Sequence, residues 1–142
     1  MSDSPALVAL LAAAMLHLGF QLTVTCLVYP ALARTDETQW SRAHDAHSRA
    51  IVPLVVLTYG ALLATLTWSW LTAPTSAGLL LATAGTVLTF ATTAFVAAPT
   101  HSHLGRNGKT RNAIHRLLLA DRVRAAGALV AAVGAVIAAT RR

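Results

Sequence analysis

The sequence is poor in charged residues and holds a single cysteine, and each shortage excludes a class of protein. Asp, Glu, Lys and Arg make up only 11% of the 142 residues, while 56% are hydrophobic and the mean hydropathy is +0.61. So apolar a chain does not suit an ordinary soluble domain. The lone Cys26 excludes an intramolecular disulfide and any cysteine-based metal cluster, and we expect it to be a small buried thiol. No phosphate-binding glycine loop is present, and no base lies near the serines in a recognisable hydrolase arrangement.

The apolar residues are gathered into four long segments, roughly 5–28, 50–72, 77–98 and 117–140. Each is close to the ~20 residues that a helix needs to cross the hydrocarbon core of a bilayer. The first segment has no basic residues before it and is longer than the apolar part of a signal peptide, so we expect a membrane span there. The sequence therefore predicts an all-α protein with one domain, residues 1–142, folded as an integral membrane four-helix bundle.

Basic residues are concentrated on one side of these four segments. They occur in or beside the connections from the first to the second segment and from the third to the fourth: Arg34, Arg42, Arg49, Arg106, Lys109, Arg111, Arg116, Arg122 and Arg124. The opposite side has only Arg141 and Arg142. The positive-inside rule then predicts that both long loops are cytoplasmic and that the N and C termini lie outside. Topology and anionic lipid account for the net charge of +6, so the expected partner is the lipid bilayer and not nucleic acid.

Prolines and tryptophans predict where the helices end, bend and meet the membrane surface. We expect Pro30 and Pro99 to break the first and third helices, and Pro53 to kink the second, which Thr35 or Asp36 would cap. The tryptophans are expected to be interfacial anchors: Trp40 at the basic side, Trp68 and Trp70 at the opposite side.

Five of the six histidines fall on the basic side of the predicted bundle. His44 and His47 lie at the start of the second helix, His101 and His103 follow the third span, and His115 begins the fourth helix. His44 and His47 are three residues apart and can share a helix face. Imidazole nitrogens bind iron, copper and zinc, and helical bundles hold metals with facing histidines. The pattern predicts a metal site built from at least three of these histidines, the alternative being that each is solvated or hydrogen-bonded at the interface.

Polar side chains inside the spans form a second group of candidates. His17 and Gln21 lie one turn apart in the first span and should face protein, because polar groups are costly in lipid. Asp121, the only acidic residue of the last three spans, is either a functional group or the ion-pair partner of Arg124. On a helical wheel Asp121 is about 120° from His115, so it suits a role in orienting a ligand. His115 and Arg122 instead share a face.

Four short motifs carry a resemblance that extends over nearly the whole chain. They are YP after the first span, WxxxHxxHSRxI at the second, PxHxxLG after the third and LLxxDRxR in the fourth. This pattern resembles small four-span membrane proteins of the bacterial plasma membrane, and distantly the anthrone-oxygenase-like membrane proteins. Some similar proteins occur in natural-product pathways that make azoxy and other nitrogen–nitrogen bonds. The resemblance implies a membrane oxidase in which His44, His101 and Arg124 are matching residues, with Tyr29, Pro30 and Pro99. Many relatives have a histidine where this chain has Val28, and His17 is the candidate to replace it.

Three functions are therefore expected, in order of preference. The first is a metal-dependent oxidase or oxygenase with one or two iron or copper ions held by His44, His47 and His101, joined by His103, His115 or His17. Its small or hydrophobic substrate would lie against Gln21 and Tyr59, with Arg122 suited to an anionic group and with Asp121 and Arg124 as catalytic candidates. The second is a non-enzymatic accessory or scaffold protein without a metal. The third is a haem protein, for which only His17 lies deep enough. Homo-oligomer formation is left open.

Overall fold

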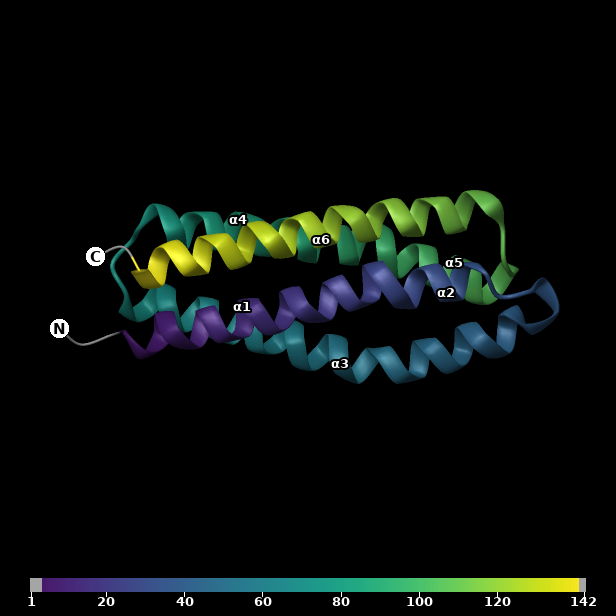
Figure 1. Ribbon diagram of the computed structural model, residues 1–142, viewed down its shortest axis with the longest axis horizontal. Helices are drawn as coiled ribbons and strands as arrows, with labels where there is room; N and C mark the ends of the chain where they lie inside the picture. Colours follow the sequence, from purple (N-terminus) through teal and green to yellow (C-terminus); the bar gives the residue numbers. More distant parts are fainter. Residues whose placement is uncertain (1–3, 141–142) are drawn as a thin grey trace.

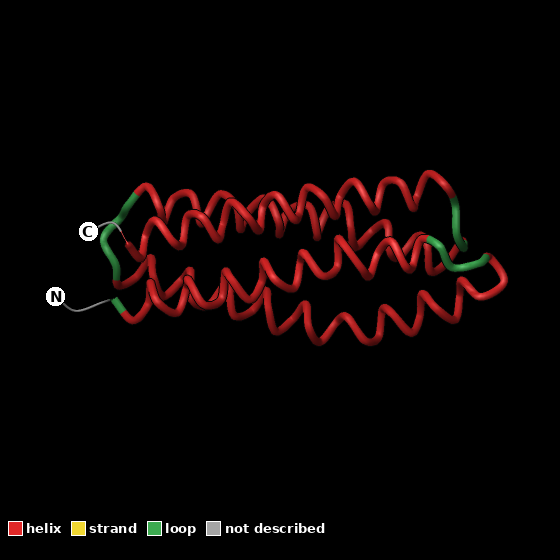
Figure 2. Tube along the Cα trace, in the orientation of Figure 1, coloured by secondary structure: helices red, strands yellow, loops and turns green. Residues whose placement is uncertain are grey.

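Four long helical segments run side by side along the molecule (Figure 1). The structure, a computed structural model, describes residues 4–140. The segments are α1 (Pro5–Thr23) continued by η1 (Val24–Val28) and α2 (Tyr29–Ala33), α3 (Glu37–Thr72), α4 (Ala77–Thr92) continued by η2 (Thr93–Ala97) and α5 (Ala98–Asn107), and α6 (Arg111–Thr140). Short connections join them, and nearly every described residue is helical (Figure 2). The predicted all-α four-helix bundle is confirmed, and all four segments are long and apolar enough to span a membrane.

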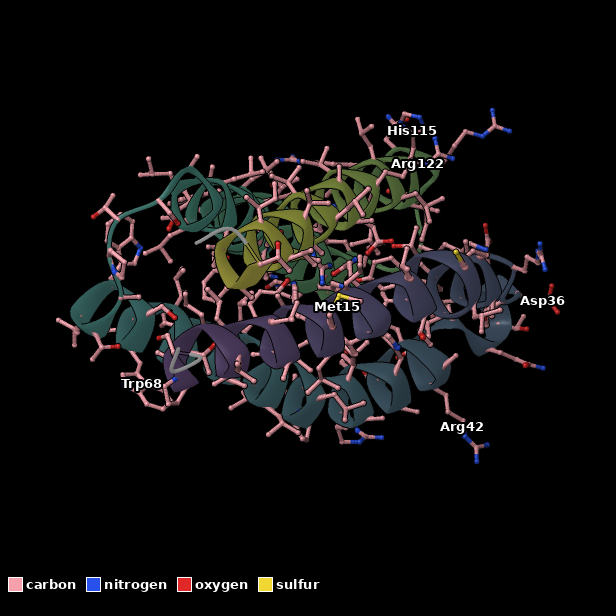
Figure 3. All side chains as sticks on the ribbon, turned by 60° about the vertical axis from the view of Figure 1, so that its left-hand side comes forward. Met15, Asp36, Arg42, Trp68, His115 and Arg122 are labelled. Carbon is pink, nitrogen blue, oxygen red and sulfur yellow. The ribbon has the colours of Figure 1, made fainter. Side chains whose placement is uncertain are left out.

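The two ends of the bundle differ in what they carry. The described ends of the chain and the α3–α4 connection lie at one end, and the other two connections lie at the opposite end (Figure 1). Asp36 and Arg42 project at the end with two connections, and Trp68 lies near the other (Figure 3). Trp68 and Trp70 are partly exposed, as expected of interfacial residues. The predicted positions of Arg141 and Arg142 fall outside the described residues.

Helices α4 and α6 pack more closely than any other pair. Glycines alternate with alanines on both helices where they meet, and a Cβ atom added to Gly85 or Gly134 would overlap backbone atoms of the facing helix. Small residues of this kind let helix backbones approach in lipid, where packing rather than water exclusion drives association. Helix α3, by contrast, contacts α4 and α5 at few places and bows outward along its length (Figure 2).

The predicted helix breaks at Pro30 and Pro99 are wrong, for the same physical reason. A proline lacks the N–H that would bond the carbonyl four residues earlier. At both places the helix widens into a five-residue π-turn just before the proline, with the Tyr29 N–H bonded to Val24 and the Ala98 N–H bonded to Thr93. Each π-turn takes up one extra residue, so the helix continues through the proline. Helix α3 likewise runs unbroken through Pro53, from an extended N-cap at Asp36.

Two smaller expectations are also corrected. Cys26 is exposed on the outer surface of η1 and not buried. In this π-turn it is the Val24 side chain that points into the bundle. Trp40 is 3% exposed and belongs to the core, where it packs with Tyr29, Leu104 and Leu117. Its indole donates a hydrogen bond to the Leu104 carbonyl at 3.3 Å, so its N–H is satisfied by protein and not by the membrane surface.

Candidate functional site

Two histidines from different helices meet inside the end of the bundle that holds the two basic connections. His44 of α3 is buried and His101 of α5 is partly buried. His44 Nε2 and His101 Nδ1 are 3.3 Å apart. The indole of Trp40 lies beside the His44 ring, with centroids 5.3 Å apart, and covers it from the side of the α2–α3 connection. The two imidazoles therefore form a hydrogen bond with each other, one nitrogen donating and the other accepting.

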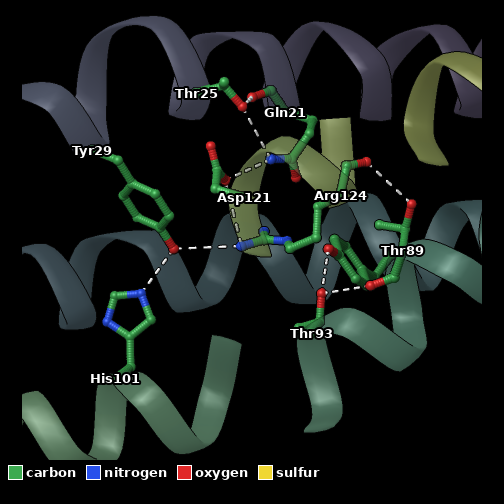
Figure 4. A network of polar contacts seen from close by, with 9 residues as sticks. Gln21, Thr25, Tyr29, Thr89, Thr93, His101, Asp121 and Arg124 are labelled. Carbon is green, nitrogen blue, oxygen red and sulfur yellow. Dashed lines mark hydrogen bonds and ion pairs between the residues drawn. The ribbon is translucent and has the colours of Figure 1, made fainter. Parts of the chain in front are cut away.

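The remaining nitrogen of each ring faces an oxygen. His101 Nε2 hydrogen-bonds the Tyr29 hydroxyl at 2.8 Å (Figure 4). His44 Nδ1 is 3.9 Å from Asp45 Oδ1, which is within ion-pair distance but too long for a hydrogen bond. Histidines that bind metals commonly use their second nitrogen on a carboxylate or another oxygen, which fixes the ring orientation. Only His101 has this arrangement, because His44 Nδ1 is buried without a hydrogen-bond partner among the described residues.

His47 completes the group of imidazoles. Its ring stacks on that of His101, with centroids 5.8 Å apart and an interplanar angle of 24°, and it lies 5.8 Å from the Tyr29 ring. His47 Nε2 is buried and has no hydrogen-bond partner among the described residues. The structure thus brings three of the predicted ligands together, two from α3 and one from α5.

The spacing of the nitrogens can be compared with the needs of a metal ion. Imidazole nitrogens at ~2.0–2.1 Å from a tetrahedral ion lie about 3.3–3.4 Å from each other. The separation of 3.3 Å between His44 Nε2 and His101 Nδ1 equals this value, but it is also the length of the hydrogen bond between the two rings. Within residues 4–140, however, no set of three or more His, Cys, Asp or Glu side chains is arranged to hold a metal. The geometry supplies two ligands, and a third requires His47 to change its orientation.

A buried charged network lies next to the histidines, deeper in the bundle (Figure 4). Arg124 and Asp121 of α6 form an ion pair at 3.6 Å, and both side chains are at most 4% exposed. Gln21 of α1 donates to Asp121 Oδ1 at 2.7 Å, while Arg124 Nη1 donates to the Tyr29 hydroxyl at 3.4 Å. Of the two alternatives for Asp121, the structure shows the ion pair with Arg124, and Tyr29 links this network to His101.

Threonines of the third span anchor the same region. Thr89 donates to the backbone carbonyl of Arg124 at 3.3 Å, and Thr93 donates to that of Thr89 at 2.8 Å. The Tyr59 hydroxyl of α3 pairs with Thr93 at 2.8 Å. Tyr59 is 8% exposed, so it is a packed residue that ties α3 to η2.

His17 lies apart from the other histidines. It is fully buried, its ring meets that of Tyr59 edge to face at 4.7 Å, and neither ring nitrogen has a partner within the described part of the chain. Gln21 Oε1, one turn away, is likewise buried and unpartnered there. His17 therefore packs against the Tyr59 ring and does not join the His44–His101 pair.

Three predicted site residues point away from this cluster. His115 and Arg122 lie on the outward face of α6 (Figure 3), opposite the buried stripe that contains Asp121 and Arg124. They do share a face, as expected, but it is the exposed one. His103 is exposed on α5, where its Nδ1 pairs with Asn107 at 3.0 Å. None of the three therefore joins His44 and His101. A separation of two residues turns His103 about 200° away from His101 on the same helix, and His115 and Arg122 lie on the exposed face of α6.

Sequence reasoning gave Tyr29 no role at the site, and it placed Trp40 at the membrane surface. Tyr29 is the residue that bonds both His101 and Arg124. A signal for it was present: a proline after an apolar span, here Pro30, marks a local change of helix geometry, and π-turns are frequent at functional sites. For Trp40, the spacing of four residues to His44 places both side chains on one face.

Comparisons of the chain with protein-family models, with curated proteins and with solved structures gave no match in any of the three. The resemblance to anthrone-oxygenase-like membrane proteins therefore stays a prediction, and the site is interpreted from its own geometry.

Proposed function

We propose that the protein is a multi-pass membrane oxidoreductase of the bacterial plasma membrane, with iron or copper held by histidine near its cytoplasmic side. The proposal rests mainly on one observation: His44 Nε2 and His101 Nδ1 face each other 3.3 Å apart, while the Tyr29 hydroxyl holds the other nitrogen of His101. His44 and His101 would hold the ion, with His47 the nearest candidate for a third ligand. Bound iron or copper supplies one-electron chemistry with dioxygen.

The surrounding residues would prepare this site in three ways. The Tyr29 hydroxyl holds the His101 ring in its orientation, and Arg124 in turn donates to Tyr29. Trp40 covers His44 and limits access of water from the loop side. The Asp121–Arg124 pair keeps the interior neutral, so no net charge has to be buried beside the ligands.

Metal analysis tests the proposal. The chain is purified from membranes, loaded with Fe²⁺ or Cu²⁺, desalted and analysed for metal per chain. We expect about one ion per chain in the native protein and its loss in the H44A/H101A double variant. The matched control is H103A/H115A, which removes two exposed histidines from the same end of the bundle and should keep the metal. Unchanged metal content in H44A/H101A would refute the metal site.

A native protein that binds no stoichiometric metal would instead support a non-enzymatic accessory role. A haem protein is distinguished in the same sample by its absorbance spectrum, since haem gives a Soret band. His17, the deep histidine, packs against Tyr59 and lies apart from the His44–His101 pair.

We further propose that both termini lie outside and both basic connections lie in the cytoplasm. The support is the concentration of exposed arginines, joined by the half-buried Lys109, at the end formed by the α2–α3 and α5–α6 connections. In a C26S background, a cysteine at Thr110 should be labelled by an impermeant maleimide only after the cells are opened. A cysteine at Ser76, in the α3–α4 connection, should be labelled in intact cells. The reverse pattern would overturn the orientation.

A further inference from the structure

A pocket of about 270 Å³ lies between α3 and the η2–α5 segment, beside the histidines. Its walls are aliphatic side chains of α3, chiefly Ile51, Val52 and Val55, together with Ala97 and Ala98. The pocket exists because α3 bows outward and contacts α4 and α5 at few places, whereas α4 is held tightly against α6.

The lining also contains polar side chains, among them Ser48 and Thr93. Tyr29, His101 and Arg124 all contribute to the pocket. Arg124 is 4% exposed, and its Nε is buried with no partner among the described residues. A buried, unpartnered donor beside a cavity is the kind of group that a ligand satisfies, because leaving it unpaired costs free energy. The pocket therefore combines apolar side chains with polar groups that suit a hydrogen-bond acceptor.

The opening of the pocket faces lipid and not water. Val52 and Val56, on its rim, are 56% and 67% exposed. Both lie in the apolar part of a segment that can span the membrane. A molecule dissolved in the bilayer can reach the pocket sideways between α3 and α5 without crossing the charged end of the bundle.

Charge balance defines the head group of such a molecule. The positive charge of Arg124 is already compensated by Asp121 at 3.6 Å. An anionic head group would add an uncompensated charge inside the membrane, which is costly. Arginine can only donate hydrogen bonds, so the atom that meets it must be an acceptor.

The geometry points to a lateral binding site for a neutral, mainly apolar molecule whose carbonyl oxygen accepts hydrogen bonds from Arg124 and Tyr29. The binding site is argued from the pocket alone. Only the statement that the bound molecule is the substrate, lying beside His101, rests on the proposed function. The volume is slightly below the ~300–1,000 Å³ usual for ligand pockets, so the site fits one small molecule and not a two-chain lipid.

Photo-crosslinking tests the inference with two probes matched in shape. Benzophenone is a neutral diaryl ketone that crosslinks to C–H groups when irradiated, and 4-benzoylbenzoate is its anionic counterpart. Each is added to the protein in lipid nanodiscs without added metal, and the crosslinked residues are mapped by mass spectrometry. We expect saturable labelling of α3 around Val55 by benzophenone, and at least about tenfold less labelling by the anion.

Two variants and a competitor complete the test. V55W fills the pocket and should remove the labelling, whereas L80W adds the same side chain to an exposed lipid-facing position of α4 and should not. Should V55W fail to fold, unlabelled fluorenone, a smaller flat diaryl ketone, should still compete with benzophenone on the native protein. Labelling spread evenly over lipid-facing residues, or stronger labelling by the anion, would overturn the inference.

The single variant H44A separates this inference from the proposed function. His44 does not line the pocket, so H44A alone should keep the saturable labelling even where metal binding is lost. Metal binding without saturable labelling would leave the metal site standing and refute the lateral pocket.

Discussion

The buried ion pair between Asp121 and Arg124 gives the most direct test of the network that supports the site. Both side chains are almost fully buried, 3.6 Å apart on one face of α6. We consider D121L, R124M and the double variant D121L/R124M. Each single change leaves one charge in the bundle without its partner, whereas the double change removes both charges.

The expected magnitudes follow from this burial. Removing one partner of a buried ion pair costs about 3–5 kcal/mol of unfolding free energy, because the other charge stays desolvated. Replacing both partners with apolar residues is often neutral. In D121L the Gln21 amide also loses its 2.7 Å bond, which adds about 1–3 kcal/mol to both the single and the double variant. The double variant should therefore be more stable than D121L.

The assay is reversible unfolding in mixed micelles with increasing SDS, followed by helical circular dichroism. The control R122M makes the same substitution two residues earlier, at an exposed position, and should change stability by less than about 0.5 kcal/mol. If the free-energy changes of the two single variants add up to that of the double variant within about 0.5 kcal/mol, the pair is not coupled and the reasoning fails.

Three further predictions concern packing and hydrogen bonds. G134A should destabilise the bundle by about 1–3 kcal/mol, because the added Cβ meets the backbone of α4. In the control G60A the added Cβ meets nothing within 4 Å, so this variant should stabilise its helix by up to about 1 kcal/mol. Changes in unfolding free energy of the same sign for both variants would contradict the close α4–α6 packing. Y29F removes the hydroxyl bonded to His101, so metal affinity measured by competition with a chelator should fall about 10–100-fold; an unchanged affinity would show that Tyr29 does not orient the ring. H17L removes two unpartnered buried nitrogens and should be neutral or stabilising, and a loss above about 2 kcal/mol would show that they are satisfied by internal water.

The sequence was sufficient for the architecture because membrane spans follow from composition alone. Four apolar runs near 20 residues leave few alternatives to a helical bundle. The same reasoning brought His44 and His101 to one end, since both lie beside loops on the same side. The position of a residue relative to the loops determines its height along the bundle. This height was sufficient to predict that His44 and His101 lie at the same end.

Rotation about the helix axis could not be predicted in the same way. His115 and Arg122 are seven residues apart and had to share a face, but nothing in the sequence alone decided whether that face was inside or outside. The bond between Tyr29 and His101 depends on a π-turn in each of two helices. If both helices are assumed to be regular, the two side chains are expected to point in other directions. Pairings of this kind arise from tertiary register and not from local patterns.

The two π-turns η1 and η2 also determine what changes of chain length the molecule tolerates. Deleting one residue from η1 would restore an ordinary α-helix and turn everything after it by about 100°. Tyr29 would then lie on a different side of its helix, and the phenol could no longer meet an imidazole. Because η2 sets the direction of His101 in the same way, the two extra residues act as a matched pair, and homologous chains that lack one should lack this tyrosine–histidine bond.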